Sequence, residues 1–440
     1  MKEKIFVLSM DAMVGEDLEY MRTKPNFSCL FQNCAQVKKM QTIYPSITYP
    51  AHVSMMTGCR PGKHGVYTND ELTDFDSFPR WHLFSSAVQV EDIFAAAKRA
   101  GCTTAAVYWP VTGCNPNVDY LLNEYFFYDP DETVEEGFAR LGSSKEMQAI
   151  ARKNFHLFPK PEERLAGINE CLRRIEFDDF LMACTCDILR QYKPDVMLVH
   201  NSWPDTVRHS YGVFNQHVTA ALDDVDEWLG QVMDAMEEAG TLADTNFILL
   251  SDHGQMDFSR RIKINVLLRR GGFIDVDDRG NITDWRAFAQ STGMSAAVFL
   301  NDPTDEKLYQ EVGDYLRRLA SEEVWGFNIV RTEDEVRELY GTYGDFAYMV
   351  ETDGYTAFGE SWREPLVSPV DITDYRLGKA THGYQPEKGP QPIFVATGPA
   401  FRPGAVLEQA YTIDEAPTYA AILGQTMPQA EGRVLHELLR

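Results

Sequence analysis

The chain has 440 residues, and 66 acidic against 41 basic residues give it a formal charge of −25. Hydrophobic residues make up 44% and charged residues 24%, which is typical of a folded globular protein and excludes a disordered one. The negative charge disfavours a role as a nucleic-acid scaffold, but it does not exclude small phosphorylated ligands, because a local metal site can override the overall field.

Short apolar runs alternate with helical patterns along the chain. The first run, Lys4–Met10, is too short for a signal-peptide core and lacks a small-residue cleavage site, so it predicts a strand. Runs that are apolar throughout are typical of strands covered on both faces. Further strands are predicted at Thr104–Tyr108, Asp195–Val199 and Asn246–Leu250, and each is preceded by a predicted helix, at Val90–Ala100, Phe177–Tyr192 and Val218–Ala239. This alternation predicts a doubly wound α/β fold with a mostly parallel sheet.

Two stretches break the alternation. Residues 120–176 are charged, aromatic and mixed, and they predict a helical insertion. Between residues 262 and 362 the strands and helices become shorter, as at Ser295–Leu300 and Phe346–Glu351. We therefore expect a core made of residues 1–261 and 363–440, with residues 262–362 inserted as a smaller α+β lobe.

The cysteines and the apolar runs bear on the compartment. No run reaches the roughly 18 apolar residues of a membrane-spanning helix, so no membrane span is predicted. The eight cysteines are scattered, and Cys184 and Cys186 form C-x-C, not the C-x-x-C pairs of a zinc ribbon. Reduced thiols and a cytoplasmic location are the resulting prediction. The sequence leaves the oligomeric state open.

Acidic and histidine side chains follow several of the predicted strands, where α/β proteins bind their ligands. The set consists of Asp11, Asp205, His209, Asp252, His253 and His382. Three carboxylates and three imidazoles suit zinc or a similar divalent ion, and they are enough for two ions. Singly, such an aspartate is more often a helix cap or a turn residue. The remaining histidines lack this context and are interpreted as structural or surface residues: His64, His82, His156, His200, His217 and His436.

A second cluster of interest surrounds Thr48. Pro50 is suited to the first turn of a helix, which would put Ser46 or Thr48 just before the helix N-terminus, where free N–H groups favour an anion. A hydroxyl at this place is usually only an N-cap. A bound metal changes its chemistry, because it lowers the pKa of the hydroxyl and creates a nucleophile without a histidine base.

Five motifs occur here in the order of a known family. They are Asp11; Thr48-Tyr-Pro-Ala-His52 with Thr57-Gly58 and His64-Gly65; Pro204-Asp205 with His209 and Tyr211-Gly212; Ser251-Asp252-His253-Gly254; and Thr381-His382-Gly383-Tyr384. From Asp11 to Tyr384 the sequence resembles the nucleotide pyrophosphatase/phosphodiesterase family of the alkaline phosphatase superfamily. The resemblance implies an alkaline-phosphatase-like α/β fold and a phosphodiesterase that acts on a small phosphodiester or nucleotide.

The resemblance also implies roles for individual residues. One zinc ion would be held by Asp205, His209 and His382, and the other by Asp11, Asp252, His253 and Thr48. Thr48 would be the nucleophile and form a phospho-threonine intermediate, and Asn69 would donate to a phosphate oxygen, as an amide aimed at developing negative charge can. Tyr49, Tyr108 and Trp109 would contact the substrate, although all three are equally compatible with core aromatics.

Several alternatives stay open. A phosphomonoesterase, a phosphonate hydrolase or a phosphomutase could use the same metal core, and a non-catalytic metal-binding relative would show a missing ligand or nucleophile, which this chain does not. No arginine equivalent to the phosphate clamp of alkaline phosphatases is evident, which favours diesters. The segment from Cys59 to Lys63 nearly matches the sulfatase motif but lies downstream of Thr48. A Rossmann dinucleotide binder is set aside, since no glycine-rich turn follows the first strand.

Overall fold

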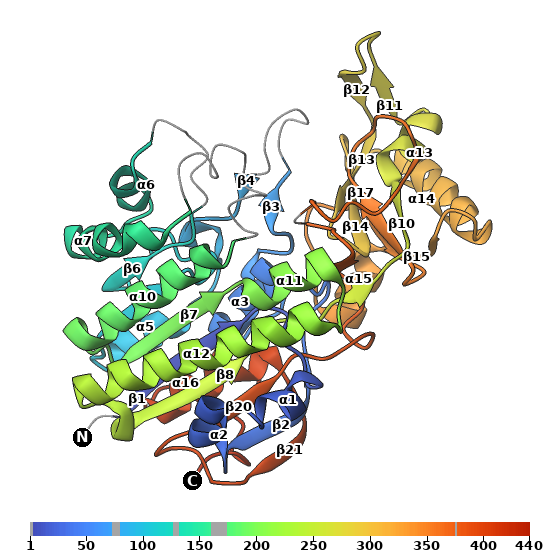
Figure 1. Ribbon diagram of the computed structural model, residues 1–440. Coiled ribbons are helices and arrows are strands. Elements are labelled where there is room, and N and C mark those ends of the chain that lie inside the picture. The colour runs from blue at the N-terminus through green and yellow to red at the C-terminus, as the bar shows by residue number, and fades with distance from the viewer. Residues whose placement is uncertain (1–2, 73–79, 126–131, 160–173, 375) are drawn as a thin grey trace.

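An eight-stranded sheet lies at the centre of the computed structural model, which describes residues 3–72, 80–125, 132–159, 174–374 and 376–440 (Figure 1). In order across the sheet the strands are β21 (Val406–Tyr411), β2 (Ala35–Gln41), β20 (Phe394–Thr397), β8 (Thr245–Leu250), β1 (Lys4–Met10), β7 (Val196–Asn201), β5 (Thr104–Val107) and β6 (Tyr120–Leu122). β20 is antiparallel to its neighbours β8 and β2, and the other strands run parallel to β1. The predicted mostly parallel α/β sheet is confirmed.

Helices cover both faces of this sheet. Successive side chains of a strand point to opposite faces, and β1 is apolar on both: Ile5 and Val7 join one hydrophobic cluster, and Phe6 and Leu8 join another. The first cluster includes side chains of α3 (Thr48–Thr57), α5 (Ile93–Arg99) and α16 (Glu415–Ile422), and the second includes side chains of α10 (Ile175–Tyr192) and α12 (Gln216–Ala239). Burial on both faces explains why the strands read as continuous apolar runs.

The region from residue 120 to 176 contributes to the core as well as to the insertion. Its first residues form β6, the strand at the edge of the main sheet, and two helices follow, α6 (Val134–Arg140) and α7 (Lys145–Asn154). Met147 and Ile150 of α7 pack in the same hydrophobic cluster as α10 and α12. The remainder of the predicted insertion, residues 126–131 and 160–173, lies outside the described residues.

A second group of strands and helices lies to one side of the core, at the upper right of Figure 1. Its antiparallel sheet consists of β13 (Ala287–Ser291), β14 (Ser295–Leu300), β16 (Tyr348–Thr352) and β15 (Phe327–Thr332). Around it lie α13 (Ile264–Arg270), α14 (Glu306–Ser321), α15 (Glu333–Tyr340), the hairpin β11 (Ile274–Val276) and β12 (Ile282–Trp285), and a small sheet of β17 (Thr356–Gly359), β10 (Arg260–Lys263) and β18 (Val367–Ser368). A hydrophobic cluster separate from those of the main sheet spans residues 262–366, which supports the proposed inserted lobe.

The remaining helices and strands are short. They are α1 (Asp17–Met21), α2 (Pro25–Phe31), α4 (Pro61–His64), β3 (Asp70–Glu71), β4 (Arg80–Trp81), α11 (Trp203–Tyr211), β9 (Met256–Asp257) and β19 (Ala380–Thr381). None of the helices in the described part of the chain is long and apolar enough to cross a membrane. The seven cysteines in that part carry free thiols.

A buried arginine ties α11 to the loop after β1. Arg208 is 0% exposed, and its Nη2 lies 2.8 Å from both carboxylate oxygens of Asp17. Its Nη1 donates to the carbonyl oxygen of Ala12 at 2.5 Å, and its Nε donates to that of Val213 at 3.2 Å. Because Ala12 follows Asp11 and Arg208 precedes His209, these contacts hold two parts of the candidate site together.

Replacing this arginine is expected to destabilise the fold. The Arg208→Met variant would leave the carboxylate of Asp17 buried and unpaired, and breaking such a buried pair costs about 3–5 kcal/mol of unfolding free energy. Urea unfolding of the chelator-treated protein measures this loss without a contribution from bound metal. Arg433, whose partner Glu437 is about half exposed, serves as the control, and Arg433→Met should change the unfolding free energy by at most about 0.5 kcal/mol. Equal stability of the two variants would contradict the prediction.

Candidate active site

The predicted metal ligands converge at the carboxyl ends of three neighbouring strands. Asp11 follows β1, Asp252 and His253 follow β8, and α11, which carries Asp205 and His209, follows β7. These strands are adjacent and parallel in the order β8, β1, β7, so their carboxyl ends meet at one edge of the sheet. The backbone N–H of Ala12, the residue after Asp11, donates to Oδ1 of Asp252 at 3.3 Å, across 240 positions of the sequence.

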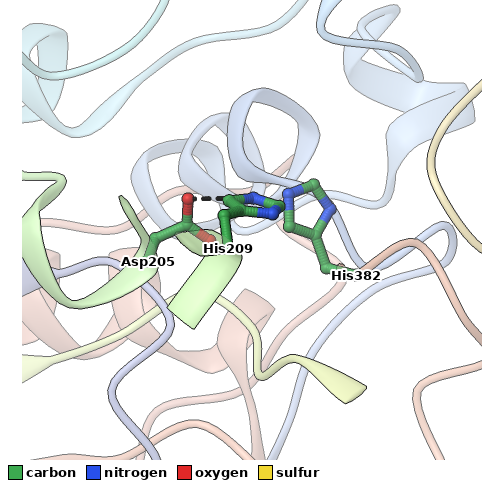
Figure 2. A group of neighbouring side chains, drawn as sticks. All are labelled: Asp205, His209 and His382. Atoms are coloured by element: carbon green, nitrogen blue, oxygen red, sulfur yellow. Dashed lines mark ion pairs between the residues drawn. The ribbon is translucent and has the colours of Figure 1, made fainter. Parts of the chain in front are cut away.

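The first group of ligand-type side chains is Asp205, His209 and His382, which point toward one another in Figure 2. One candidate ligand atom from each lies within 4.8 Å of those of the other two. Asp205 and His209 share one face of α11, with Oδ2 and Nε2 3.2 Å apart. Nδ1 of His209 lies 2.7 Å from the carbonyl oxygen of Ala380; such a bond fixes the ring so that its other nitrogen faces the cluster.

The second group surrounds the hydroxyl of Thr48. Its Oγ1 lies 3.1 Å from Nε2 of His253 and 3.4 Å from Oδ2 of Asp11. His253 Nε2 lies 3.2 Å from Oδ2 of Asp252 and 3.5 Å from Oδ1 of Asp11. Ligand atoms of Asp11, Asp205 and His253 also lie within 4.8 Å of one another. Asp205 therefore belongs to both groups, and the two sets adjoin.

Burial shapes the ionisation of this cluster. It raises the pKa of Asp11 well above its usual range, and the charge of Asp205 raises it further. Burial also raises the pKa of Asp252, with a further contribution from Asp11. Burial alone would raise the pKa of Asp205, but His209 and His382 lower it to about 2. Burial lowers the pKa of His253 to about 3. Carboxylates held close together with neutral imidazoles are the donor set that a divalent cation balances.

Unsatisfied oxygens support the fit of a cation. Oδ1 of Asp11 and Oδ2 of Asp252 are buried, and neither makes a hydrogen bond with any residue in the described part of the chain. Buried carboxylate oxygens nearly always have a partner. The missing partner is of the kind that a metal ion provides, so the residues present fit divalent metal binding.

Thr48 is the first residue of α3, and its hydroxyl does not cap the helix. The N-cap position is Ile47, which makes no side-chain capping bond. Pro50 falls in the first turn, as predicted, although the helix begins at Thr48 itself and not after it. The other candidate, Ser46, donates to the carbonyl oxygen of Tyr384 at 2.8 Å. The N-cap interpretation of Thr48 is therefore wrong, and the hydroxyl faces the carboxylate and histidine cluster instead.

A cavity of about 340 Å³ opens over Thr48 and both ligand groups, and Asn69 is part of its wall. The amide oxygen of Asn69 accepts the backbone N–H of Tyr49 at 3.0 Å. This bond orients the side chain, and its NH₂ group is the end that can donate to a bound anion. Asn69 thus stands in the cavity wall with an amide group able to donate, and its role as a donor to phosphate stays a prediction.

The three predicted substrate-contacting aromatics lie in different places. Tyr49 lines the cavity, and its ring packs on Trp81 with centroids 5.0 Å apart. Tyr108 and Trp109 are fully buried and are not among the residues that line the cavity. Tyr108 packs edge-on against Phe177, and Trp109 packs edge-on against His52. Their geometry supports core packing and gives no support to the prediction that they contact substrate.

Two polar residues that line the cavity are not predicted from the sequence. His200, interpreted as a structural or surface histidine, lines the cavity, and its Nε2 lies 3.0 Å from Oδ2 of Asp11. It lies one residue before the carboxyl end of β7, a position that could have identified it. Glu124 also lines the cavity and bonds the hydroxyl of Tyr49, and burial raises its pKa to about 7. Only the fold brings Glu124 to this wall.

Two arginines stand in the cavity wall, although none was evident as a clamp from the sequence. Arg376 Nη2 lies 2.8 Å from Oδ1 of Asp70, and its Nη1 lies 3.7 Å from Oε2 of Glu360. Arg261 is the second, and its Nη1 lies 2.5 Å from Oδ2 of Asp374. Because arginines do line the cavity, a missing arginine no longer argues for diesters.

The mostly parallel sheet and the paired clusters of aspartate and histidine beside a helix-initial threonine define an alkaline-phosphatase-like α/β protein. Residues 5–385 match the family described as type I phosphodiesterase / nucleotide pyrophosphatase. The chain belongs to this family, and the resemblance noted from the motifs is confirmed.

Curated relatives carry the names of enzymes that cleave phosphoric ester bonds. Human ectonucleotide pyrophosphatase/phosphodiesterase family member 1 is 25% identical over 256 residues, which are 54% of this chain and 22% of the human protein. Venom phosphodiesterase CdcPDE of Crotalus durissus collilineatus is 24% identical over 262 residues, which are 58% of this chain and 26% of the venom protein. The matches thus span about a quarter of the length of these relatives.

Solved structures of related proteins share the fold. Murine ectonucleotide pyrophosphatase/phosphodiesterase 5, in an inactive form in complex with AMP, aligns with a TM-score of 0.69 and 18% identity over 100% of both chains. The human protein of the same name gives a TM-score of 0.69 and 18% identity over 100% of both chains. These similarities confirm the predicted alkaline-phosphatase-like architecture.

Proposed function

We propose that this chain hydrolyses phosphodiester or pyrophosphate bonds of small substrates such as nucleotides, with Thr48 as the nucleophile. The observation that carries the proposal is the position of the Thr48 hydroxyl. Thr48 is the first residue of α3, but its hydroxyl does not cap the helix. Its Oγ1 lies 3.1 Å from Nε2 of His253 and 3.4 Å from Oδ2 of Asp11, within a buried cluster of ligand-type groups. Family membership and the AMP complex of a structural relative support a nucleotide-sized substrate.

Two divalent ions are part of the proposal, and zinc best matches the mixture of imidazole and carboxylate ligands. Asp205, His209 and His382 would hold one ion, and Asp11, Asp252, His253 and Thr48 would hold the other. When bound, the ions lower the pKa of a hydroxyl and place positive charge beside the oxygens of the reacting phosphate.

The residues of the chain act in two steps. Asp11 and His253 orient Oγ1 of Thr48, which gives up its proton to solvent water. Oγ1 then bonds to phosphorus while the bond to the leaving oxygen breaks, and the leaving group departs with the electron pair of that bond. The NH₂ group of Asn69 donates to a non-bridging phosphate oxygen as charge develops there. Water then attacks the phospho-threonine, releases the phosphorylated product and restores the hydroxyl of Thr48.

Substrate preference is the direct test of this function. With zinc present, we expect kcat/KM for p-nitrophenyl thymidine 5′-monophosphate to exceed that for p-nitrophenyl phosphate by at least about tenfold, because the chain belongs to a family of type I phosphodiesterases and nucleotide pyrophosphatases and the nucleoside adds contacts that p-nitrophenyl phosphate lacks. Release of p-nitrophenolate at equal substrate concentrations measures both. A preference for the monoester would overturn the phosphodiesterase proposal in favour of a phosphomonoesterase or phosphomutase, with Arg376 as the candidate clamp.

A further inference from the structure

The cavity is bordered by two chemically different sets of residues. Around Thr48, the core contributes the aromatic rings of Tyr49 and Trp81 and the carboxyl group of Glu124. On the other side, β10, where the chain enters the lobe, contributes two cations, Arg261 and Lys263, and β17 with the segment that follows it contributes Phe358, Gly359, Glu360 and Ser361. A substrate bound at Thr48 therefore meets different chemistry on its two sides.

Arg261 and Lys263 stand side by side on one strand. They are alternate residues of β10, so both side chains leave the same face. Lys263 pairs in register with Gly359 of the parallel neighbour β17. A Cβ added at Gly359 would lie 3.2 Å from Cγ of Lys263 and 3.4 Å from Cγ and Cδ of Arg261. The missing side chain of Gly359 thus makes room for the two cationic side chains along the cavity.

Both cations retain capacity for a further partner. Nε of Arg261 donates to Oγ of Ser368 at 2.8 Å, and its Nη1 donates to Oδ2 of Asp374. Its Nη2 makes no hydrogen bond within the described part of the chain. Nζ of Lys263 donates to the carbonyl oxygen of Arg363 at 3.0 Å, and no carboxylate among the described residues lies within 4.0 Å of it. The acidic side chain that follows Arg363 in sequence, Glu364, instead pairs with Arg270 at 2.8 Å.

The neighbouring positive charges repel each other. Burial lowers the pKa of Lys263, and the charge of Arg261 lowers it further. An anion placed between an ammonium and a guanidinium removes this repulsion and accepts hydrogen bonds from both, and charge-assisted bonds of this kind are the stronger ones.

We propose that Arg261 and Lys263 form a subsite for an anionic group, a phosphate or a carboxylate, on the part of the substrate that extends from the reacting phosphorus toward the lobe. This inference rests on the proposed function, since it names the substrate arm that the lobe selects. Substrates with a charged second arm are then favoured over substrates whose second arm is neutral.

The test uses three substrates that share one nucleoside 5′-phosphoryl design and differ in the second arm. The p-nitrophenyl ester of thymidine 5′-monophosphate has an uncharged arm, its 4-carboxyphenyl ester carries a carboxylate, and dTTP carries phosphates. We expect Lys263→Gln and Arg261→Gln each to lower kcat/KM for the charged arms by about 10-fold to 100-fold, mainly through KM, as loss of a charge-assisted bond predicts. Activity on the p-nitrophenyl ester should change less than about threefold. Loss with dTTP alone assigns the subsite to phosphate, and loss with the carboxyphenyl ester alone assigns it to carboxylate.

Two further variants control for structure. Gly359→Ala keeps both charges but crowds their aliphatic stems, so it should reduce activity on the charged arms in the same direction. Lys307→Gln, on α14 of the same lobe, removes an exposed lysine that is not part of the cavity and should leave all three substrates unaffected. If Lys263→Gln and Arg261→Gln change all three substrates equally, the subsite is refuted while the phosphodiesterase function stands. If the wild-type protein hydrolyses none of them, the proposed function itself fails.

Discussion

The Thr48→Ala variant is expected to lose turnover of the p-nitrophenyl diester by a factor on the order of 10³ or more, because it lacks the oxygen that bonds to phosphorus. Thr48→Ser keeps a hydroxyl at the start of α3 and should retain measurable activity. Steady-state release of p-nitrophenolate with zinc present measures the loss. In the wild-type protein, acid quenching during turnover followed by peptide mass analysis should find the transferred phosphoryl group on Thr48.

A control on the same helix separates chemistry from folding. Thr57 is the last residue of α3, and its buried Oγ1 donates to the carbonyl oxygen of Val53 at 2.7 Å. Thr57→Ala therefore removes a buried threonine hydroxyl that bonds to the backbone of its own helix. This variant should lose stability without a comparable loss of turnover. Thr48→Ala protein that turns over within tenfold of wild type would exclude Thr48 as the nucleophile.

Removal of metal is expected to abolish turnover and to destabilise the fold. Without cations, the carboxylates of Asp11, Asp205 and Asp252 repel one another in a buried site, and oxygens of Asp11 and Asp252 lack a hydrogen-bond partner among the described residues. Zinc at about 1,000 times its Kd should stabilise the native state by about 4 kcal/mol. Thermal unfolding of chelator-treated and zinc-reconstituted protein measures this shift, and elemental analysis measures the number of ions bound.

Replacing single ligand residues tests which residues hold each of the two ions. His209→Ala removes a ligand of the first group and should lower the zinc content from two ions per chain to one, because ligand loss weakens a site that has few protein donors. His217→Ala, which removes an exposed histidine stacked on Tyr211, should keep both ions. A zinc content of two in His209→Ala, or full activity after chelation, would contradict the proposed metal centre.

Most of the candidate metal ligands can be predicted from the sequence, because α/β proteins bind ligands with residues that follow their strands closely in the chain. Asp11 and Asp252 come within two residues of the ends of apolar runs, which places them at the carboxyl ends of strands. Asp205 and His209 follow the next apolar run, β7, and their spacing of four residues puts both on one face of a helix. The structure brings these residues together with His382. His200 obeys the same rule, yet its pattern does not distinguish it, because a histidine inside an apolar strand looks like a core residue.

Other features of the site carry no such local signal. Glu124 reaches the cavity because β6 pairs with β5, and Lys263 reaches it because β10 pairs with β17. Tyr108 and Trp109 match a family motif, but packing against Phe177 and His52 places them in the core. A motif specifies which side chain is present, and the packing of the surrounding elements specifies what it faces.

The mostly parallel α/β fold and the ligand-type residues follow from the amino-acid sequence, because strand burial and strand-end chemistry depend on neighbouring residues in the chain. The family follows from the sequence too, through the resemblance of its five motifs. Two features of the site follow only from packing. Asp205 adjoins both ligand groups, and β10 adds Arg261 and Lys263 to the cavity. These are contacts between distant segments, and their geometry depends on how the sheet, the helices and the lobe fit together.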